Sequence, residues 1–168
     1  MSQIDIIKNK ILSGLGLKLK LAIWRFQDRK IVFTNGCFDI LHLGHIDYLS
    51  KAADLGNILV MGLNTDSSVS RIKGPHRPLQ DEESRAMILA SLRFVDAVVL
   101  FNEDTPYELI QQIQPDILVK GADYKPEDII GYDVVMAKGG EVVTIDFLPG
   151  YSTSGIENKI LANAQQKK

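Results

Sequence analysis

Two histidines at a close spacing are the first feature that could do chemistry. His42 and His45 belong to the run His-Leu-Gly-His at the start of a segment with helical apolar spacing. A separation of three residues puts both imidazoles on one side of a helical turn, and Gly44 between them leaves room for a bulky ligand. The N–H groups of a first helical turn point the same way. The pattern therefore predicts a phosphate site, and a nucleoside triphosphate would fit it.

Two other interpretations of these histidines stay open at this level. Both could be buried structural residues that backbone groups satisfy. A zinc site would need further ligands, and Cys37 alone lies nearby in the sequence. The preceding segment 34–39 contains Gly36, which would let a phosphate approach the backbone closely, although such glycines also make ordinary turns.

A basic segment lies in the middle of the chain. Arg71, Lys73, His76 and Arg77 put four basic groups within seven residues, in a stretch that Gly74 and two prolines interrupt. A solvated loop is the usual structure of such a charge cluster. The interpretation that we favour is a mobile phosphate clamp, irregular over residues 71–78, that closes over the ends of the strands.

Polar residues also follow the later predicted strands. Ser152–Ser154 would cap the last helix or form a second anion site, or both, because the cap and the anion use the same N–H groups. Lys120, Asp123 and Tyr124 could bind either a nucleoside or an acceptor molecule. Asp39 could bind the acceptor or tie its loop through an Asx-type hydrogen bond.

The elements that must position these residues alternate between strand and helix. Short apolar runs predict strands near 31–33, 58–63, 97–101, 116–119 and 141–145. Helices are expected at 45–55, 81–94, from 105, from 126 and at 153–164. This order predicts a single doubly wound, Rossmann-like α/β domain at residues 27–168 with a five-stranded parallel sheet. The candidate residues then follow strands, at the edge where such sheets bind ligands.

Composition narrows the functional class further. The 168 residues carry a formal charge of −2, without the basic excess typical of nucleic-acid binders. One cysteine allows no intrachain disulfide, and no apolar run is long enough for a membrane span. We therefore expect a cytoplasmic protein with neither nucleic-acid nor membrane partners. Residues 1–26 have helical spacing and predict a short N-terminal arm, which either packs on the core or makes a dimer contact.

Residues 34–45 resemble the signature of the nucleotidyltransferase superfamily that carries the His-x-Gly-His motif. Further segments of the chain are similar to its cytidylyltransferase-like branch: 62–69, 71–74, 77–78, 83–85, 118–124 and 151–156. In this order they most resemble the D-glycero-β-D-manno-heptose 1-phosphate adenylyltransferases of lipopolysaccharide core biosynthesis. The resemblance covers roughly residues 27–162, and at this length the chain would be the stand-alone form.

The resemblance implies roles for individual residues. The catalytic residues would be His42, His45 and Lys73, which would act on the phosphates. The residues expected to bind the nucleotide are Thr34, Asn35, Gly36, Cys37, Phe38, Gly44, Asn64, Asp66, Lys120, Gly121, Ser152, Thr153 and Ser154. Those expected to bind the acceptor are Asp39, Arg85, Asp123 and Tyr124. Mg²⁺ would be held by phosphates and water, so no dedicated metal ligands are expected.

The implied reaction transfers AMP from ATP to a sugar 1-phosphate and releases pyrophosphate. The attacking phosphate is already an anion, so alignment and charge neutralisation would carry catalysis without a general base. A cytidylyltransferase that uses a polyol phosphate such as glycerol 3-phosphate is the alternative in the same class. Another class is a nucleotide-binding module without catalysis. An aminoacyl-tRNA synthetase fragment shares a similar histidine motif but would need a basic surface. A homodimer is the expected assembly.

Overall fold

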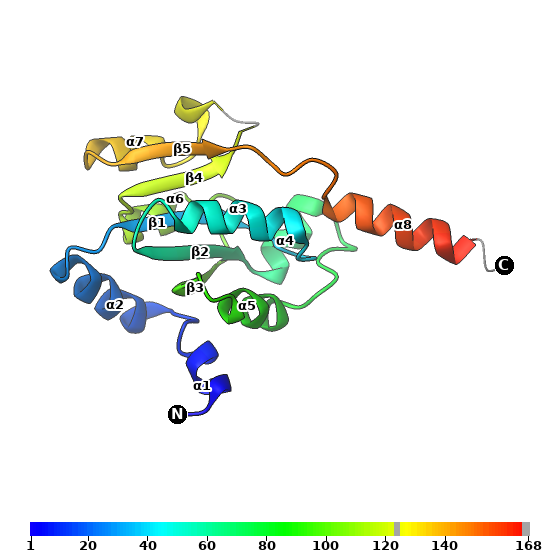
Figure 1. Ribbon diagram of the computed structural model, residues 1–168, viewed down its shortest axis with the longest axis horizontal. Helices are drawn as coiled ribbons and strands as arrows, with labels where there is room; N and C mark the ends of the chain where they lie inside the picture. Colours follow the sequence, from blue (N-terminus) through cyan, green and yellow to red (C-terminus); the bar gives the residue numbers. More distant parts are fainter. Residues whose placement is uncertain (123–124, 166–168) are drawn as a thin grey trace.

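The computed structural model describes residues 1–122 and 125–165, and its centre is a parallel sheet (Figure 1). All neighbouring strands are parallel, in the order β3-β2-β1-β4-β5. The strands are β1 (Ile31–Gly36), β2 (Ile58–Asn64), β3 (Ala97–Phe101), β4 (Ile117–Gly121) and β5 (Glu141–Ile145). The predicted fold class and its five strands are confirmed. From β1 the chain adds β2 and β3 on one side of the sheet and then β4 and β5 on the other. The switch point of the fold therefore lies between the carboxyl ends of β1 and β4.

Helices cover both faces of the sheet. On one face α3 (Leu43–Ala53) and α5 (Glu82–Ser91) pack against side chains of β1, β2 and β3. On the other face α2 (Gly14–Phe26), α6 (Tyr107–Ile113) and α7 (Tyr132–Ala137) do the same. Along β1, Val32 points into the first layer and its neighbours Ile31 and Phe33 into the second. A strand buried on both faces must be apolar throughout, which is why these runs were readable from the sequence.

One helix includes part of the basic segment that was predicted to be irregular. Helix α4 (Asp66–Lys73) includes Arg71 and Lys73, so the irregular structure predicted for 71–78 is wrong for residues 71–73. The Thr65 side chain caps this helix by accepting a hydrogen bond from the Ser68 amide. Gly74, at φ +100°, ends it. The helix is short and rich in serine, and Val69 and Ile72 are its only apolar residues, too few to reveal a helical period in the sequence.

The boundaries of two predicted helices also move. Helix α3 begins at Leu43 rather than His45, which makes His42 its N-cap residue. Helix α5 ends at Ser91 rather than near Phe94. The residue before α5, Asp81, caps it as expected, with its side chain accepting from the Ser84 amide.

The N-terminal segment forms two helices, α1 (Gln3–Lys8) and α2. Leu17, Leu21 and Trp24 of α2 are buried in the core. Between the helices, Ile11 pairs with Val98 in a parallel bridge at the edge of the sheet. The segment therefore packs on the core, and the dimer contact considered for it stays a prediction.

The C-terminal part of the chain holds a short 3-10 turn, η1 (Pro126–Asp128), and α8 (Thr153–Gln165). Helix α8 extends away from the sheet (Figure 1), and none of its described residues is buried. Within residues 1–122 and 125–165, no helix combines the length and apolar character that crossing a membrane requires.

Candidate active site

A cleft of about 600 Å³ opens at the carboxyl ends of the strands. Its volume falls in the usual range for small-molecule sites. The structure brings many of the predicted site residues together in its walls: Asn35, Gly36, Cys37, Phe38, Asp39, His45, Asn64, Lys73, Lys120, Gly121, Thr153 and Ser154. Six others lie outside its lining: Thr34, His42, Gly44, Asp66, Arg85 and Ser152. Asp123 and Tyr124 lie outside the described residues.

The two histidines form a stacked pair. Their ring centroids lie 3.8 Å apart at 24°, and the Phe38 ring meets His45 edge-on at 5.3 Å. Burial lowers the pKa of His45 to about 4, with a further contribution from His42. Burial also lowers the pKa of His42. Both rings are therefore neutral near pH 7 in the free protein, and each still carries one N–H donor.

The buried edges of these rings have unused hydrogen-bonding capacity. The Nδ1 atoms of His42 and His45 are buried and have no hydrogen-bond partner among the described residues. Buried polar atoms normally find partners, so such a pair points to a functional site. Of the two rings, His45 lines the cleft and His42 stacks behind it.

The start of α3 adds backbone donors to the histidines. His42 has extended backbone and caps the helix without a side-chain hydrogen bond. The first bonds inside the helix run from the amides of His45 and Ile46 to the His42 carbonyl, so the Leu43 and Gly44 amides precede them. A Cβ atom on Gly44 would lie 3.1 Å from both His42 Nδ1 and Tyr151 Cβ. A side chain at this position would therefore crowd the imidazole of His42.

The end of β1 forms the floor of the cleft. Lys120 of β4 donates a hydrogen bond to Asn35 Oδ1 of β1, which links these neighbouring strands at the switch point. Thr34 is fully buried, and its hydroxyl lies 2.8 Å from the Tyr48 hydroxyl of α3. Thr34 thereby fixes the position of α3 on the sheet, and Tyr48 itself reaches the cleft.

Asp39 lines the cleft and also ties two segments together. Its carboxylate accepts hydrogen bonds from Arg77 Nη1 at 2.7 Å, the Leu79 amide at 2.7 Å and the Gln80 amide at 3.0 Å. Burial raises the pKa of Asp39, but these hydrogen bonds and the Arg77 charge outweigh it and leave the pKa below its usual range. Arg77 also pairs with Glu157 of α8. Asp39 therefore links the loop after β1 to residues 77–80.

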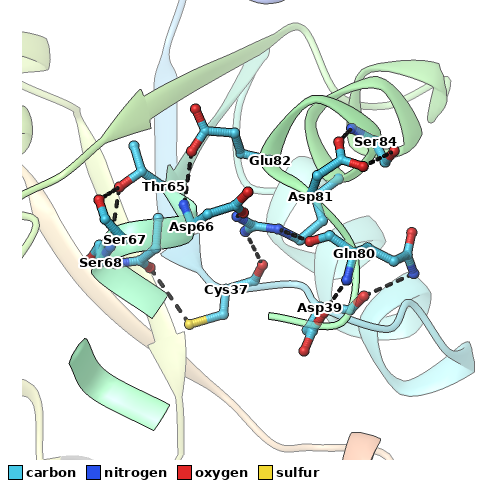
Figure 2. A network of polar contacts seen from close by, with 12 residues as sticks. Cys37, Asp39, Thr65, Asp66, Ser67, Ser68, Gln80, Asp81, Glu82 and Ser84 are labelled. Atoms are coloured by element: carbon cyan, nitrogen blue, oxygen red, sulfur yellow. Dashed lines mark hydrogen bonds and ion pairs between the residues drawn. The ribbon is translucent and has the colours of Figure 1, made fainter. Parts of the chain in front are cut away.

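Arg85 lies behind the cleft wall, not in it. Its side chain is fully buried and donates to the carbonyls of Gln80 at 3.0 Å and Cys37 at 2.7 Å, and to Asp66 Oδ1 at 2.7 Å. Figure 2 shows these three partners converging. The Asp66 amide in turn donates to Glu82 Oε2 at 2.8 Å. Arg85 therefore braces the segments after β1 and β2 against the start of α5.

Sequence reasoning missed part of the lining. Tyr48, Val69, Ile72, Phe101, Asp104, Pro106 and Phe147 also line the cleft, as does Arg77, which was expected in the clamp but not among the assigned site residues. A signal for three of them was present, because Phe101 ends the third predicted strand and Asp104 and Pro106 follow it, so all three must lie near the same edge of the sheet. Val69 and Ile72 lie on the same face of α4 as the predicted Lys73, and they were missed because that helix was not predicted.

The last helix contributes the remaining wall. Thr153 and Ser154 line the cleft at the start of α8. Ser152 has a local role, because its hydroxyl accepts a hydrogen bond from the Gly155 amide at 3.0 Å. The helix start therefore combines a cap with an opening toward the cleft, as the sequence allowed.

Comparisons with known proteins identify the same family branch that the sequence motifs resemble. Residues 33–157 match the family model described as cytidylyltransferase-like. The bifunctional protein HldE of Magnetococcus marinus is 53% identical over 154 residues, covering 92% of this chain and 32% of that protein. HldE of Citrifermentans bemidjiense is 58% identical over 137 residues, 82% of this chain and 28% of that protein. The chain thus spans only about a third of the length of these curated relatives.

Two solved structures share the fold. The lipopolysaccharide core biosynthesis protein from Thermoplasma volcanium GSS1 is 30% identical with a TM-score of 0.59, covering 71% of this chain and 98% of that one. Pantoate-beta-alanine ligase from Francisella tularensis, in complex with beta-gamma ATP and beta-alanine, has a TM-score of 0.57. The match covers 89% of this chain and 77% of the ligase at 18% identity, which shows a common fold alone. From the extent of the family match and the identity to its relatives, the chain belongs to the cytidylyltransferase-like family of nucleotidyltransferases.

Proposed function

We propose that the protein transfers AMP from ATP to a sugar 1-phosphate and releases pyrophosphate. The acceptor that we favour is D-glycero-β-D-manno-heptose 1-phosphate, for lipopolysaccharide core biosynthesis. The observation that carries the proposal is the convergence on one cleft of His45, the start of α8, Lys73 and Lys120. These groups together suit a polyphosphate and a second phosphate better than any neutral ligand. The use of ATP also fits the expected cytoplasmic location.

The reaction follows from the placement of charge. A phosphate oxygen of the acceptor attacks the α-phosphorus of ATP, the new P–O bond forms, and the bond to the leaving pyrophosphate breaks. N–H groups of the two histidines and of the α3 start would donate to phosphate oxygens, and Lys73 would neutralise charge that moves onto the leaving group. The protein's part is alignment and electrostatics, since the nucleophile needs no base.

Mg²⁺ would enter with the triphosphate. Across the described ranges, no group of three or more His, Cys, Asp or Glu side chains could hold a metal ion. The carboxylates that line the cleft are also engaged, Asp39 with Arg77 and Asp104 with Arg71. Phosphate oxygens and water would therefore supply the ligands, which suits the octahedral preference of Mg²⁺.

The choice of nucleotide separates the proposal from its alternative. The resemblance to heptose 1-phosphate adenylyltransferases and the relative named for lipopolysaccharide core biosynthesis support ATP with a sugar phosphate. The description of the family favours the alternative, a cytidylyltransferase acting on a polyol phosphate such as glycerol 3-phosphate.

One assay distinguishes these functions. The protein is incubated with Mg²⁺, each of the four nucleoside triphosphates and a panel of sugar and polyol phosphates, and pyrophosphate release is measured. We expect release with ATP and a sugar 1-phosphate. Release with CTP and a polyol phosphate would establish the alternative. Nucleotide binding without release in any combination would indicate a binding module.

Lys73 offers a test of the phosphate site within this assay. Its side chain is exposed at the end of α4, so Lys73→Ala should change the free energy of unfolding by no more than about 0.5 kcal/mol. We expect kcat/KM to fall about tenfold or more, because a cation that meets transition-state charge is lost. Lys73→Arg should restore little, since a planar guanidinium does not replace a compact ammonium. Unchanged kinetics in Lys73→Ala would remove this residue from the mechanism.

A further inference from the structure

Helix α2 is apolar on two opposite faces, of which only the inner one packs on the core. Its outer face carries four large apolar side chains that we call the outer stripe: Leu15 (71% exposed), Leu19 (56%), Ile23 (49%) and Phe26 (90%). Figure 1 shows α2 at the opposite end of the molecule from α8. A helix that covers a core needs one apolar face, so a second one indicates a further contact.

The outer stripe has the apolar area of a standard protein interface. Its four side chains expose on the order of 450 Å² per copy of the chain. One partner of a standard interface contributes about 800 Å², of which slightly more than half is apolar, or about 450–500 Å². Exposed apolar patches of this size on soluble proteins usually mark interaction sites. The area therefore suffices for a stable complex with one partner.

The spacing on this face suits pairing with a second copy of the same helix. Four exposed residues follow one another at the four-three-four spacing of a seam between two helices: Leu15, Leu19, Ala22 and Phe26. In an antiparallel pair around a two-fold axis, Leu19 of one copy lies opposite Ala22 of the other. Leu15 then lies opposite Phe26. The small Ala22 makes room for Leu19 beside the axis, whereas a parallel pair would face Ala22 with Ala22 and leave a gap.

The charges on α2 also favour the antiparallel arrangement. Arg25 turns toward its own fold and donates to the Ile113 carbonyl at 2.6 Å. Lys18 and Lys20 flank the outer stripe, where their stems cover its edges and their ammonium groups stay in water. In the antiparallel register the two Lys18 residues lie ~12 Å apart, beyond the range of strong repulsion in salt. A parallel pair would set like charges side by side.

We propose that the outer stripe is the interface of a symmetric homodimer, in which the α2 helices of two copies pack antiparallel. No described residue that lines the cleft belongs to α2, so each copy keeps a complete cleft. Helices α2 and α3 also cover opposite faces of the sheet. The dimer therefore leaves the two clefts independent of each other. This inference does not depend on the reaction that the cleft catalyses.

Sedimentation velocity of the full chain over a range of concentrations tests the interface. The wild type should be a dimer at micromolar concentration. Leu19→Glu puts a carboxylate into the seam and should raise the dissociation constant of the dimer about thirtyfold or more. Its far-ultraviolet circular dichroism should match that of wild type, because the side chain is exposed in a single copy. Leu161→Glu, at a leucine of α8 that is 60% exposed, is the matched control and should stay dimeric.

Cross-linking tests the antiparallel register independently. Leu15→Cys and Phe26→Cys are prepared as separate proteins in a Cys37→Ser background and treated with a short bis-maleimide. Neither protein alone should cross-link, because equal positions of the two copies lie about 16 Å apart along the helix axis. An equimolar mixture of the two should give a cross-linked dimer. Cross-linking within each protein alone would show a parallel pair and overturn the proposed packing.

The remaining outcomes assign the outer stripe to other occupants or to none. A wild type that stays monomeric at every concentration overturns the homodimer, and binding of that monomer to phosphatidylglycerol vesicles would assign the stripe to a membrane surface. A dimer that persists in Leu19→Glu also overturns the proposal, and its loss in Leu161→Glu would place the interface on α8.

Turnover in the pyrophosphate assay tests the independence of the two clefts. The rate per chain should be the same in wild type and in monomeric Leu19→Glu, since no part of α2 lines the cleft. A folded monomer that has lost turnover would show that each cleft needs the partner copy. A wild-type dimer without turnover on any substrate pair would overturn the proposed function and leave the interface intact.

Discussion

The two walls of the cleft are built in opposite ways. The wall made by the end of β1 and the start of α3 is braced from behind by Arg85, by Asp39 and by the Thr34–Tyr48 contact. The wall made by α8 supplies Thr153 and Ser154 but has no buried residue in its described length. Its charged tie to the rest of the cleft runs from Glu157 to Arg77.

This difference assigns different work to the two walls. Groups that stabilise a transition state must hold their positions before substrate arrives, because reorganisation during the reaction would cost rate. The braced wall, which carries His45, meets that condition. A helix with few apolar contacts belongs to the low-stability end of a structure, from which closing elements are drawn. We therefore expect the α3 wall to be rigid and the α8 wall to respond to ligand.

The largest effect should come from removal of the brace. Arg85→Met leaves the Gln80 and Cys37 carbonyls and the Asp66 carboxylate without their guanidinium partner. We expect the free energy of unfolding to fall by about 3–5 kcal/mol, because two part-buried carbonyls lose their charged donor and the half-exposed Asp66 carboxylate loses its cation, with turnover lost as well. Chemical denaturation measures the change. A loss of turnover in a variant of wild-type stability would contradict the bracing role and return Arg85 to the acceptor site, as the resemblance had implied.

The second-largest effect should be on the rate of the reaction, with the stability of the fold almost unchanged. His45→Ala removes a donor from the braced wall, and we expect kcat to fall about 10²–10³-fold, or roughly 2.7–4 kcal/mol in the barrier. The melting temperature should change little. His42→Ala tests the stacked partner in the same assay and should also lower kcat. A variant that keeps near-wild-type turnover with ATP and the best acceptor would show that its histidine is structural.

These two residues also show how far sequence reasoning reaches. His45 could be assigned to the cleft because its spacing from His42 and its place after a strand are both local patterns. Arg85 could not be placed, because burial of an arginine depends on carbonyls that come from residues 37 and 80, far away along the chain. Sequence shows the charge of such a residue, but tertiary packing decides whether the charge meets substrate or backbone.

The same contrast holds for the fold. All strands were predicted: β1 to β4 contain mostly buried residues and therefore need apolar runs, and the less buried edge strand β5 still carries the β-branched residues typical of strands. Helix α4 was missed, because its start is held by hydroxyl caps to Asn102 and by few apolar contacts. Asp104 was missed with it, although its position after the third predicted strand was a usable signal.

Acid should weaken the braced wall through His45. Its pKa in the folded protein is about 4, below the ordinary value of 6.5, so folding favours the neutral ring. The associated stability is present above pH 6.5 and is lost as the pH falls toward 4. Allowing for partial exposure, wild type should lose about 1 kcal/mol more than His45→Gln between pH 7 and pH 5. Parallel losses in the two proteins, measured by urea denaturation, would rule out this origin.

The smallest effect should come from the tie to the α8 wall. Glu157→Gln removes the charge that pairs with Arg77, whereas Arg77 keeps its contact with Asp39. Since the pair is partly exposed, we expect the free energy of unfolding to change by no more than about 0.5 kcal/mol. Hydrogen exchange in residues 153–165 should nevertheless become faster in the free protein, and a non-hydrolysable ATP analogue should slow it in both proteins. Exchange in residues 47–53, beyond the first turn of α3 that would meet the phosphates, should stay the same throughout, because Glu157 contacts neither Arg85 nor the Thr34–Tyr48 pair. If the analogue protected residues 47–53 and left α8 unchanged, the assignment of rigid and responsive walls would have to be reversed.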